Sequence, residues 1–382
     1  MARPLTSVGI SDSGKYMRAD VLRFGLPDPG DVSGLRNAIE GGAVDPHSIA
    51  VVIGKTHGNG LVNDYTRGYL AQSLSHLISE KTGETPQAVR QRIPLIFSGG
   101  VEGVLSPHYT VFTVTEDAAL PRGKALAVGG GFTPDLNPED IGRQRQIDLT
   151  AAAVRDAMNK AAIAEPSDVH FVQVKGPAFT LADIRASERR GRAPVTDNPG
   201  KLMSFGRAAS ALGVALALGE IEPGRAVESA VLKDFGVYSA VASCSAGVEV
   251  RANEIMVLGM SDKWSGPLII AHAAMADALD LGAAQAAIRG LGFSSNGQLS
   301  AEDARRLRAG FVKCEASRDG LVRGRPHVML NDGDIDQQRH IRAAVGAIVA
   351  SVVNDTALFV SGGAEHQGPD GGGMIALIAQ RG

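Results

Sequence analysis

The sequence has few of the residues that indicate an extracellular or a nucleic-acid-binding protein. Only two cysteines occur among 382 residues, Cys244 and Cys314, too few for a disulfide framework and typical of a reducing cytoplasm. Lys and Arg total 38 against 41 Asp and Glu, so the chain lacks the excess positive charge that phosphate binding needs. The one basic cluster, RASERRGR at 185–192, contains an acid and no aromatic residue, and we interpret it as a solvated loop. We therefore expect a cytoplasmic protein with no nucleic-acid partner.

Membrane segments and familiar cofactor motifs are also missing. The start, MARPLTSVGISDSGKYMR, has no signal-peptide core, and the longest apolar run of the last third, AVGAIVASVV, falls short of the roughly 20 residues of a membrane span. His57, His108 and His366 show neither HxH nor HExxH spacing, which disfavours a zinc site. GKT at 54–56 imitates a phosphate-binding loop, but Ile49 stands where the motif requires glycine. We expect no membrane partner and no organic cofactor.

What the chain does contain is glycine, with 47 residues, in a pattern that repeats. FSGGVEG at 97–103 returns as CSAGVEV at 244–250 and as VSGGAEH at 360–366. A turn that needs only flexibility has no reason to keep its serine. The recurrence indicates three copies of one structural unit.

Each copy is predicted as a strand ending in lysine, a helix and a strand ending in serine. The strand pairs are IAVVIGK (49–55) with PLIFSGG (94–100), DVHFVQVKGP (168–177) with YSAVASCSAG (238–247), and AGFVKCEAS (309–317) with TALFVSGG (356–363). The first helix, DYTRGYLAQSLSHLISEKTG, is predicted to be capped by Asp64 and to stop at Gly83. The second, SFGRAASALGVALALGE, is predicted to open at Ser204, and the third lies in DIDQQRHIRAAVGAIVASVV.

The repeat aligns three residue types that carry chemistry, with an arginine near the start of each predicted helix. Around a pseudo-threefold axis they would line one pocket: Lys55, Lys175 and Lys313; Arg67, Arg207 and Arg342; Ser98, Ser245 and Ser361. The third arginine is ambiguous: Arg339 has the spacing from the cap, whereas Arg342 opens RAAVGA, which resembles RAASAL after Arg207. We prefer Arg342.

Such a pocket favours acyl transfer at an amide. A neutral lysine can take the proton of a serine, and burial with neighbouring cations lowers the pKa of the lysine. Arginine forks suit carbonyl oxygens of an electron-poor ring, and Ser–Gly backbone N–H groups suit an oxyanion. Cys244 and Cys314 adjoin Ser245 and Lys313 on their strands, so both thiols should face away from the pocket. We predict ring-opening hydrolysis of a small, threefold-like polycarbonyl compound.

The glycine run GGAEHQGPDGGG at 362–373 has two interpretations. With Glu315 it could form an all-oxygen site for a hard cation such as Mg²⁺ or Ca²⁺. From the residues alone, a tight glycine turn is the favoured alternative.

The motifs resemble those of the cyanuric acid hydrolase and barbiturase family. The resemblance covers nearly the whole chain after about residue 18 and rests on GKTHGNGLVNDYTRGY (54–69), SGGVEGVLSPH (98–108), VKGPAFT (174–180), SAVASCSAGVE (239–249), FVKCEASRDGLVRGR (311–325) and SGGAEHQGPDGGG (361–373). It implies an α/β fold of three concatenated α/β repeats around a pseudo-threefold axis, with an inner strand barrel and outer helices. We place unit A at 1–118, unit B at 119–262 and unit C at 263–382.

The resemblance also implies roles for individual residues. Ser245 is expected to be the nucleophile and Lys175 its base, because one ring is attacked by one serine and the family assigns that task to the second repeat. The remaining family positions are substrate-binding: Lys55, Arg67, Ser98, Gly99, Arg207, Ala246, Lys313, Arg342, Ser361 and Gly362. A structural metal is implied at Glu315, Ala364, Gln367, Gly368, Pro369 and Gly372, which reverses the preference for a simple turn.

The resemblance leaves two candidate substrates, and the sequence departs from the family at one position. The third site keeps SGG like the first, which favours cyanuric acid, opened to carboxybiuret and then to biuret and CO₂. The alternatives are a barbiturase, which would open barbituric acid to ureidomalonate, and a non-catalytic binder of a threefold cyclic anion. His57 stands where the family usually has an acid, and residues 1–18 are expected to be disordered or peripheral. The family also suggests a homotetramer.

Overall fold

The computed structural model describes residues 15–382. In it, each of the three units forms a sheet of four strands. Unit A contains β1 (Tyr16–Gly25), α1 (Ser33–Glu40), β2 (Ile49–Thr56), α2 (Thr66–Thr82), α3 (Pro86–Arg92), β3 (Leu95–Gly99) and β4 (His108–Asp117). Unit B contains β5 (Ala125–Phe132), α4 (Gln144–Lys160), β6 (Val169–Pro177), α5 (Leu181–Arg189), α6 (Pro199–Leu218), β7 (Ala242–Gly247) and β8 (Glu254–Ser261). Unit C contains β9 (Trp264–Ser265), β10 (Leu268–Met275), α7 (Leu281–Gly290), α8 (Ala301–Ala304), β11 (Leu307–Cys314), β12 (Leu321–Val322), β13 (Arg325–Pro326), α9 (Gln337–Val353), β14 (Phe359–Gly362) and β15 (Gly373–Gln380).

The three sheets share one strand order. They read β3-β2-β4-β1, β7-β6-β8-β5 and β14-β11-β15-β10, and in each the two strands that carry lysine and serine are parallel neighbours. Each unit is therefore larger than the strand–helix–strand copy predicted from sequence, because an earlier strand and helix and a final strand complete it. The short β9 of unit C pairs in parallel with β1 of unit A and extends that sheet.

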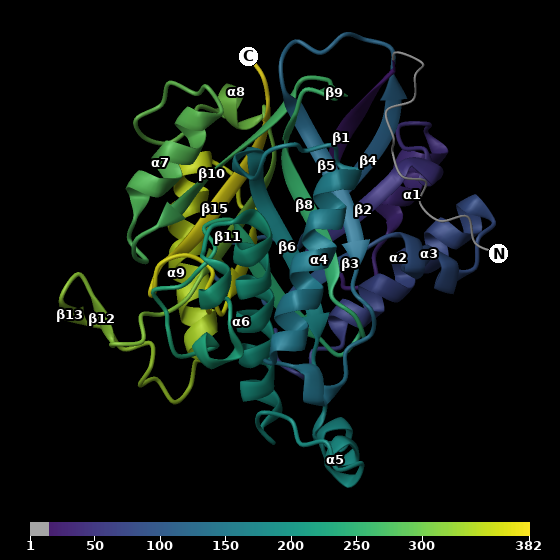
Figure 1. The fold of residues 1–382 in the computed structure, drawn as a ribbon. Helices are drawn as coiled ribbons and strands as arrows, with labels where there is room; N and C mark the ends of the chain where they lie inside the picture. Colours follow the sequence, from purple (N-terminus) through teal and green to yellow (C-terminus); the bar gives the residue numbers. More distant parts are fainter. Residues whose placement is uncertain (1–14) are drawn as a thin grey trace.

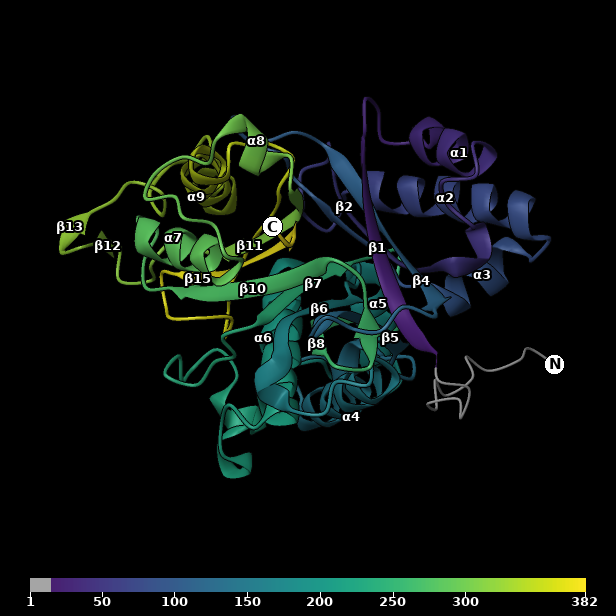
Figure 2. The ribbon, with the colours of Figure 1, turned by 90° about the horizontal axis from the view of Figure 1, so that it is seen from above.

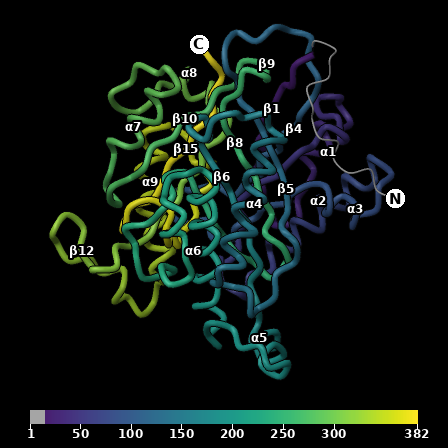
Figure 3. Tube along the Cα trace, in the orientation of Figure 1, coloured from purple at the N-terminus to yellow at the C-terminus, as the bar shows by residue number. Residues whose placement is uncertain are grey.

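The sheets lie inside and the helices outside. Figure 2 shows α2, α4, α6, α7 and α9 around the strands, and Figure 3 traces the three successive units along the chain. Apolar residues of all three units form one buried cluster, in which Phe311 stacks on Phe171 with ring centroids 4.5 Å apart. The predicted α/β fold, three concatenated repeats with an inner barrel of strands, is confirmed. Helix α5 and the hairpin β12–β13 project from this body (Figure 1).

Two helix starts were predicted wrongly. Helix α6 begins at Pro199 after the cap Asn198, whose side chain accepts from Lys201 N, so Ser204 lies inside the helix. Helix α2 begins at Thr66, so its cap position is Tyr65 rather than Asp64. The Asp64 side chain still accepts a hydrogen bond from Thr66 N. The predicted stop at Gly83 is confirmed, since its φ of 76° closes α2 in the left-handed region.

Two further expectations concern the chain's start and membranes. Residues 1–14 lie outside the described part of the chain, but the expected peripheral segment 1–18 overlaps β1, which begins at Tyr16. Among residues 15–382, only α6 is long and apolar enough to cross a membrane. Because 72% of its apolar window is buried inside the structure, α6 has the surroundings of a core helix.

Candidate active site

The lysines and serines of the repeat are neighbours across parallel strand pairs. Lys55 stands opposite Ser98, and the same register pairs Lys175 with Ser245 and Lys313 with Ser361. All three lysines are almost fully buried, because β2, β6 and β11 are central strands of their sheets. A one-residue slip would turn each side chain to the other face, so the sheet register itself fixes each pair.

One small pocket collects the residues that end these strands. Its walls carry the three serines, the residue after each serine, the three arginines and three further residues: Ser98, Gly99, Ser245, Ala246, Ser361, Gly362, Arg67, Arg207, Arg342, Gly60, Met203 and Gln338. Arg339, the alternative to Arg342, is half exposed on α9 and does not line the pocket. The lysines are not on the pocket wall. Lys55 and Lys313 reach it through the hydroxyls of their serines.

The three lysine–serine pairs are not equivalent. Lys55 Nζ donates to Ser98 Oγ at 3.2 Å and to Gly99 O at 2.9 Å. Lys313 makes the same two contacts in unit C, with Ser361 Oγ at 3.1 Å. Lys175 Nζ instead donates to Phe97 O at 2.6 Å and forms an ion pair with Glu249 at 2.8 Å.

The hydroxyl of the second site is consequently held by another residue. Ser245 Oγ accepts from Gln173 Nε2 at 3.3 Å, a longer contact than either lysine–serine hydrogen bond. The predicted nucleophile and base are thus brought together by register, but they are not hydrogen-bonded in the free protein.

Burial sets the charge state of these lysines. It lowers the pKa of Lys313 to about 7, with Arg207 as a further cause, and lowers that of Lys55 well below the ordinary value, with help from Arg342. Burial lowers the pKa of Lys175 to about 8, while the Glu249 carboxylate opposes the change. A lysine that is partly neutral near neutral pH can accept a serine proton.

Three glutamates that the sequence analysis left without a role hold the arginines. Each lies four residues after its serine and pairs with an arginine of a different unit: Glu102 with Arg342, Glu249 with Arg67 and Glu365 with Arg207. The Glu102 and Glu365 pairs are two-pronged, with N–O distances of 2.5–2.8 Å. The signal was visible as the acid repeated in each motif, but its partner lies far away in sequence.

The second glycine of two of the motifs makes room for these arginines. Gly100 has φ +90°, and a Cβ there would lie 2.5 Å from Arg342 Nη2. Gly363 has φ +73°, and its Cβ would lie 2.8 Å from the Arg207 guanidinium. The SGG sequence therefore serves close approach of a neighbouring unit as well as the turn itself.

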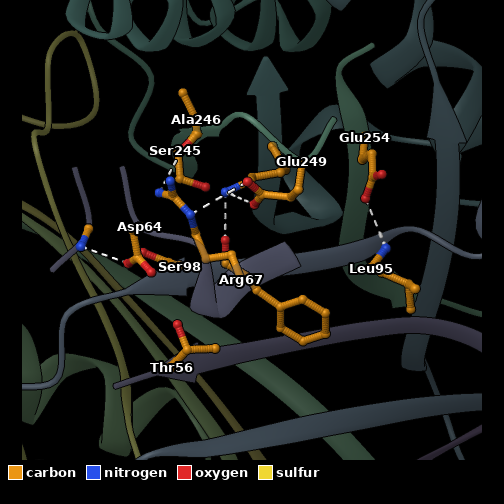
Figure 4. A network of polar contacts seen from close by, with 12 residues as sticks. Thr56, Asp64, Arg67, Leu95, Ser98, Ser245, Ala246, Glu249 and Glu254 are labelled. Carbon is orange, nitrogen blue, oxygen red and sulfur yellow. Dashed lines mark hydrogen bonds and ion pairs between the residues drawn. The ribbon is translucent and has the colours of Figure 1, made fainter. Parts of the chain in front are cut away.

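Asp64, predicted only as a helix cap, also holds the loop before α2. It is buried, its Oδ2 accepts from Gly60 N, and its Oδ1 accepts from the backbone and hydroxyl of Thr66. Figure 4 shows it beside Ser98 and Arg67. Asp64 thus fixes the loop that leads from β2 to the arginine of α2, whereas His57 earlier in that loop is exposed.

Both cysteines face away from the pocket, as predicted. Cys244 and Cys314 are buried and absent from its walls. Burial raises the pKa of each thiol to about 12, so neither is a thiolate nucleophile at neutral pH.

The segment predicted to hold a metal packs against Glu315, whose side chain contacts Ala364 and Arg318. Glu315 Oε1 is buried and accepts no hydrogen bond, although Arg318 Nη1 lies 2.5 Å away, and Glu315 Oε2 accepts from Ala364 N. The Gln367 side chain is occupied by Cys244 N and by the carbonyls of Gly363 and Glu365, which leaves only its backbone oxygen for a metal. Arg318 thus already places a positive charge beside the Glu315 Oε1 atom, and burial raises the pKa of Glu315 to about 8, so the metal site stays a prediction.

Comparison with known proteins gives consistent matches over nearly the whole chain. The family model described as "Amidohydrolase ring-opening protein" matches residues 20–380. The cyanuric acid amidohydrolase of Pseudomonas sp. (strain ADP) is 47% identical over 363 residues, which cover 94% of this chain and 99% of the relative. A cyclic amide hydrolase of Azorhizobium caulinodans is 44% identical over 365 residues, covering 95% of this chain and 100% of the relative.

Solved structures agree with these matches. A cyanuric acid hydrolase described as an evolutionary innovation by structural concatenation superposes with a TM-score of 0.91 at 46% identity, covering 96% of this chain and 100% of that one. The crystal structure of a cyanuric acid hydrolase from A. caulinodans gives a TM-score of 0.88 at 46% identity, with the same coverage.

Proposed function

The chain belongs to the family of ring-opening amidohydrolases, and from this membership we propose that it is a hydrolase that opens the ring of cyanuric acid. The observation that carries the proposal is the single pocket lined by three arginines and three serines from three equivalent units. Cyanuric acid has three carbonyl groups related by true threefold symmetry. A pocket built from three corresponding units can offer one arginine and one serine to each carbonyl.

The arginines are positioned to bind the ring. All three arginines are buried, and Arg207 and Arg342 are each held by two hydrogen bonds to a glutamate before the substrate arrives. Arg67 donates to Ala246 O and Leu61 O and lies 3.5 Å from Glu249. A planar fork of donors matches carbonyl oxygens, and pre-ordering it lowers the entropy lost on binding. Gly99, Ala246 and Gly362 line the pocket, and their backbone N–H groups are proposed to stabilise negative charge on a carbonyl oxygen.

Hydrolysis is proposed to start at Ser245. Its Oγ forms a bond to a ring carbonyl carbon while its proton passes to neutral Lys175, and the ring C–N bond then breaks as Lys175 returns the proton to the leaving nitrogen. Water cleaves the resulting ester and gives carboxybiuret, which loses CO₂ to give biuret. Ser98 and Ser361, hydrogen-bonded to Lys55 and Lys313, are proposed to bind the other two carbonyls.

The remaining predictions concern a metal, assembly and location. A Mg²⁺ or Ca²⁺ ion held by the Glu315 carboxylate and by backbone carbonyls around Ala364, Gln367, Gly368, Pro369 and Gly372 would neutralise buried charge next to the pocket and hold the C-terminal loop. The homotetramer and the cytoplasmic location stay predictions.

Turnover with two substrates tests the proposal. Purified protein should consume cyanuric acid much faster than barbituric acid. Loss of ultraviolet absorbance measures the consumption of each ring, and detection of biuret identifies the product from cyanuric acid. Faster consumption of barbituric acid would make it a barbiturase. Binding of either ring by calorimetry without any turnover would make it a binder rather than an enzyme.

A further inference from the structure

Of the three corresponding glutamates, Glu249 alone pairs with an arginine and a lysine among the described residues. Glu102 also has a second cation, Arg339 at 3.7 Å, but no lysine. Glu102 makes two hydrogen bonds to Arg342, at 2.7 and 2.6 Å. Glu249 Oε2 instead lies 3.5 Å from Arg67 Nε, while its Oε1 lies 2.8 Å from Lys175 Nζ. Arg67 Nε and both carboxylate oxygens of Glu249 are buried and make no hydrogen bond of good geometry among the described residues, so the contacts of Glu249 with Arg67 and Lys175 are ion pairs. Arg67 is thus held less completely by its glutamate than Arg342 is.

The shared carboxylate coincides with the one lysine that does not contact its serine. Where the glutamate binds only arginine, in unit A's motif, Lys55 donates to Ser98. Where the glutamate also pairs with the lysine, Lys175 makes no hydrogen bond to Ser245, whose hydroxyl accepts from Gln173 instead. The lysine, serine and glutamate correspond in the two units, whereas Gln173 stands where unit A has Ile53. The second site therefore differs from the first both in the glutamate contact of its lysine and in the partner of its serine.

The other charged groups around Lys175 come from two further elements. Arg67 faces it from α2, and Glu254 on β8 is its register partner. Glu254 Oε2 accepts from Leu95 N at 2.9 Å, so this carboxyl group is bound to the backbone of unit A (Figure 4). Unit A has His108 at the position of Glu254, which leaves Lys55 without a second carboxylate on that side. Glu249 is therefore the acid in ion-pair contact with Lys175.

We propose that Glu249 is the positioning residue that controls Lys175: it holds the lysine away from Ser245 in the free enzyme and releases it by moving fully onto Arg67. After release, Lys175 lies beside the Arg67 charge without a counter-ion and loses its proton to solvent. Its neutral Nζ then accepts the proton of Ser245 Oγ. This inference rests on the proposed function for its kinetic test, but not for its spectroscopic test.

The kinetic test compares Glu249→Gln with the matched variant Glu102→Gln. In Glu249→Gln the lysine loses its carboxylate, so the acidic limb of the kcat/KM profile for cyanuric acid should move about one to three pH units lower. Glu102→Gln should raise KM through Arg342 and leave the limb in place. An unmoved limb in Glu249→Gln, or an equal movement in both variants, would overturn the proposal.

The spectroscopic test follows Lys175 directly by NMR of protein labelled with ¹³C at lysine Cε, with the signal assigned from Lys175→Arg. The titration midpoint of Lys175 should fall in Glu249→Gln and stay in Glu102→Gln, whether or not any substrate is hydrolysed. An unchanged Lys175 midpoint in Glu249→Gln would contradict the inference even if the enzyme is active. A shifted midpoint in a protein that turns over no substrate would contradict only the proposed function. If Glu249→Gln does not fold, Glu249→Asp, which is one methylene too short to reach both cations, should shift in the same direction by less.

Discussion

Replacing Ser245 by alanine separates chemistry from binding. The variant removes the proposed nucleophile, so kcat for cyanuric acid should fall at least about 10⁴-fold, which corresponds to about 5.4 kcal/mol of barrier. The fold should be little affected, because Ser245 Oγ gives up only one long hydrogen bond, from Gln173 Nε2 at 3.3 Å. Loss of one such contact changes substrate affinity or stability by about 0.5–1.5 kcal/mol.

Ser98→Ala and Ser361→Ala are the matched comparisons. Each removes an acceptor for a buried lysine, yet Lys55 keeps Gly99 O at 2.9 Å and Lys313 keeps Gly362 O at the same distance. These variants should therefore fold, raise KM and slow turnover by about 10- to 100-fold, the effect of one or two hydrogen bonds in the transition state. Steady-state kinetics and calorimetric binding of cyanuric acid provide the two measurements.

The reasoning fails if the ranking is reversed. Activity of Ser245→Ala above about 1% of the unmodified enzyme would show that another group attacks the ring. A dead Ser98→Ala or Ser361→Ala beside an active Ser245→Ala would move the active dyad to another unit.

Three further predictions concern stability. Phe311→Ala should lower the free energy of unfolding by about 3–5 kcal/mol, because a buried ring at the barrel centre is lost, whereas the exposed Leu120→Ala should change it by less than about 0.5 kcal/mol; urea titration measures both. Burial raises the pKa of Glu254 from 4.5 to about 8, so the folded protein keeps a proton that the unfolded chain releases, and the free energy of unfolding should fall between these pH values by up to about 1.4 kcal/mol per pH unit. Glu254→Gln should flatten that slope, and a slope equal to that of the unmodified protein would contradict the assignment. EDTA should lower the Tm of the unmodified protein and leave that of Glu315→Gln unchanged; equal responses would argue against a metal at Glu315.

The sequence allowed the lysine–serine pairs to be predicted because they depend on local pattern. A strand ending in lysine and a later strand ending in serine within one repeat are parallel neighbours, so register alone brings Lys55 to Ser98. The same reasoning missed the first strand and helix of each unit, since β1 with α1 carries no repeated reactive residue to mark it. The start of α6 was predicted wrongly at Ser204 because this serine stands shortly before Arg207. The helix begins five residues earlier, at Pro199, and Arg207 lies in its interior.

The roles of the glutamates could not be predicted for a different reason. Glu102 is separated from Arg342 by 240 residues, and no periodicity connects positions so far apart. Nor does the pattern show that Glu249 also binds Lys175, because CSAGVEV keeps the same glutamate as the other two motifs. These contacts depend on how the units pack against one another, which is a property of the folded chain.

The exchange of ion pairs between units has a consequence for folding. Each arginine–glutamate pair of the pocket joins residues of two different units. When only two units have folded, one of the three pairs can form, and the other two wait for the third unit. The last contacts to form join residues 158 and 240 positions apart, and the loop-closure entropy of such contacts delays them until most of the chain is ordered. During synthesis, the N-terminal units can thus reach native-like structure before any binding pocket exists. Substrate binding by a refolding chain would therefore report closure of the whole ring, later than any signal from secondary structure.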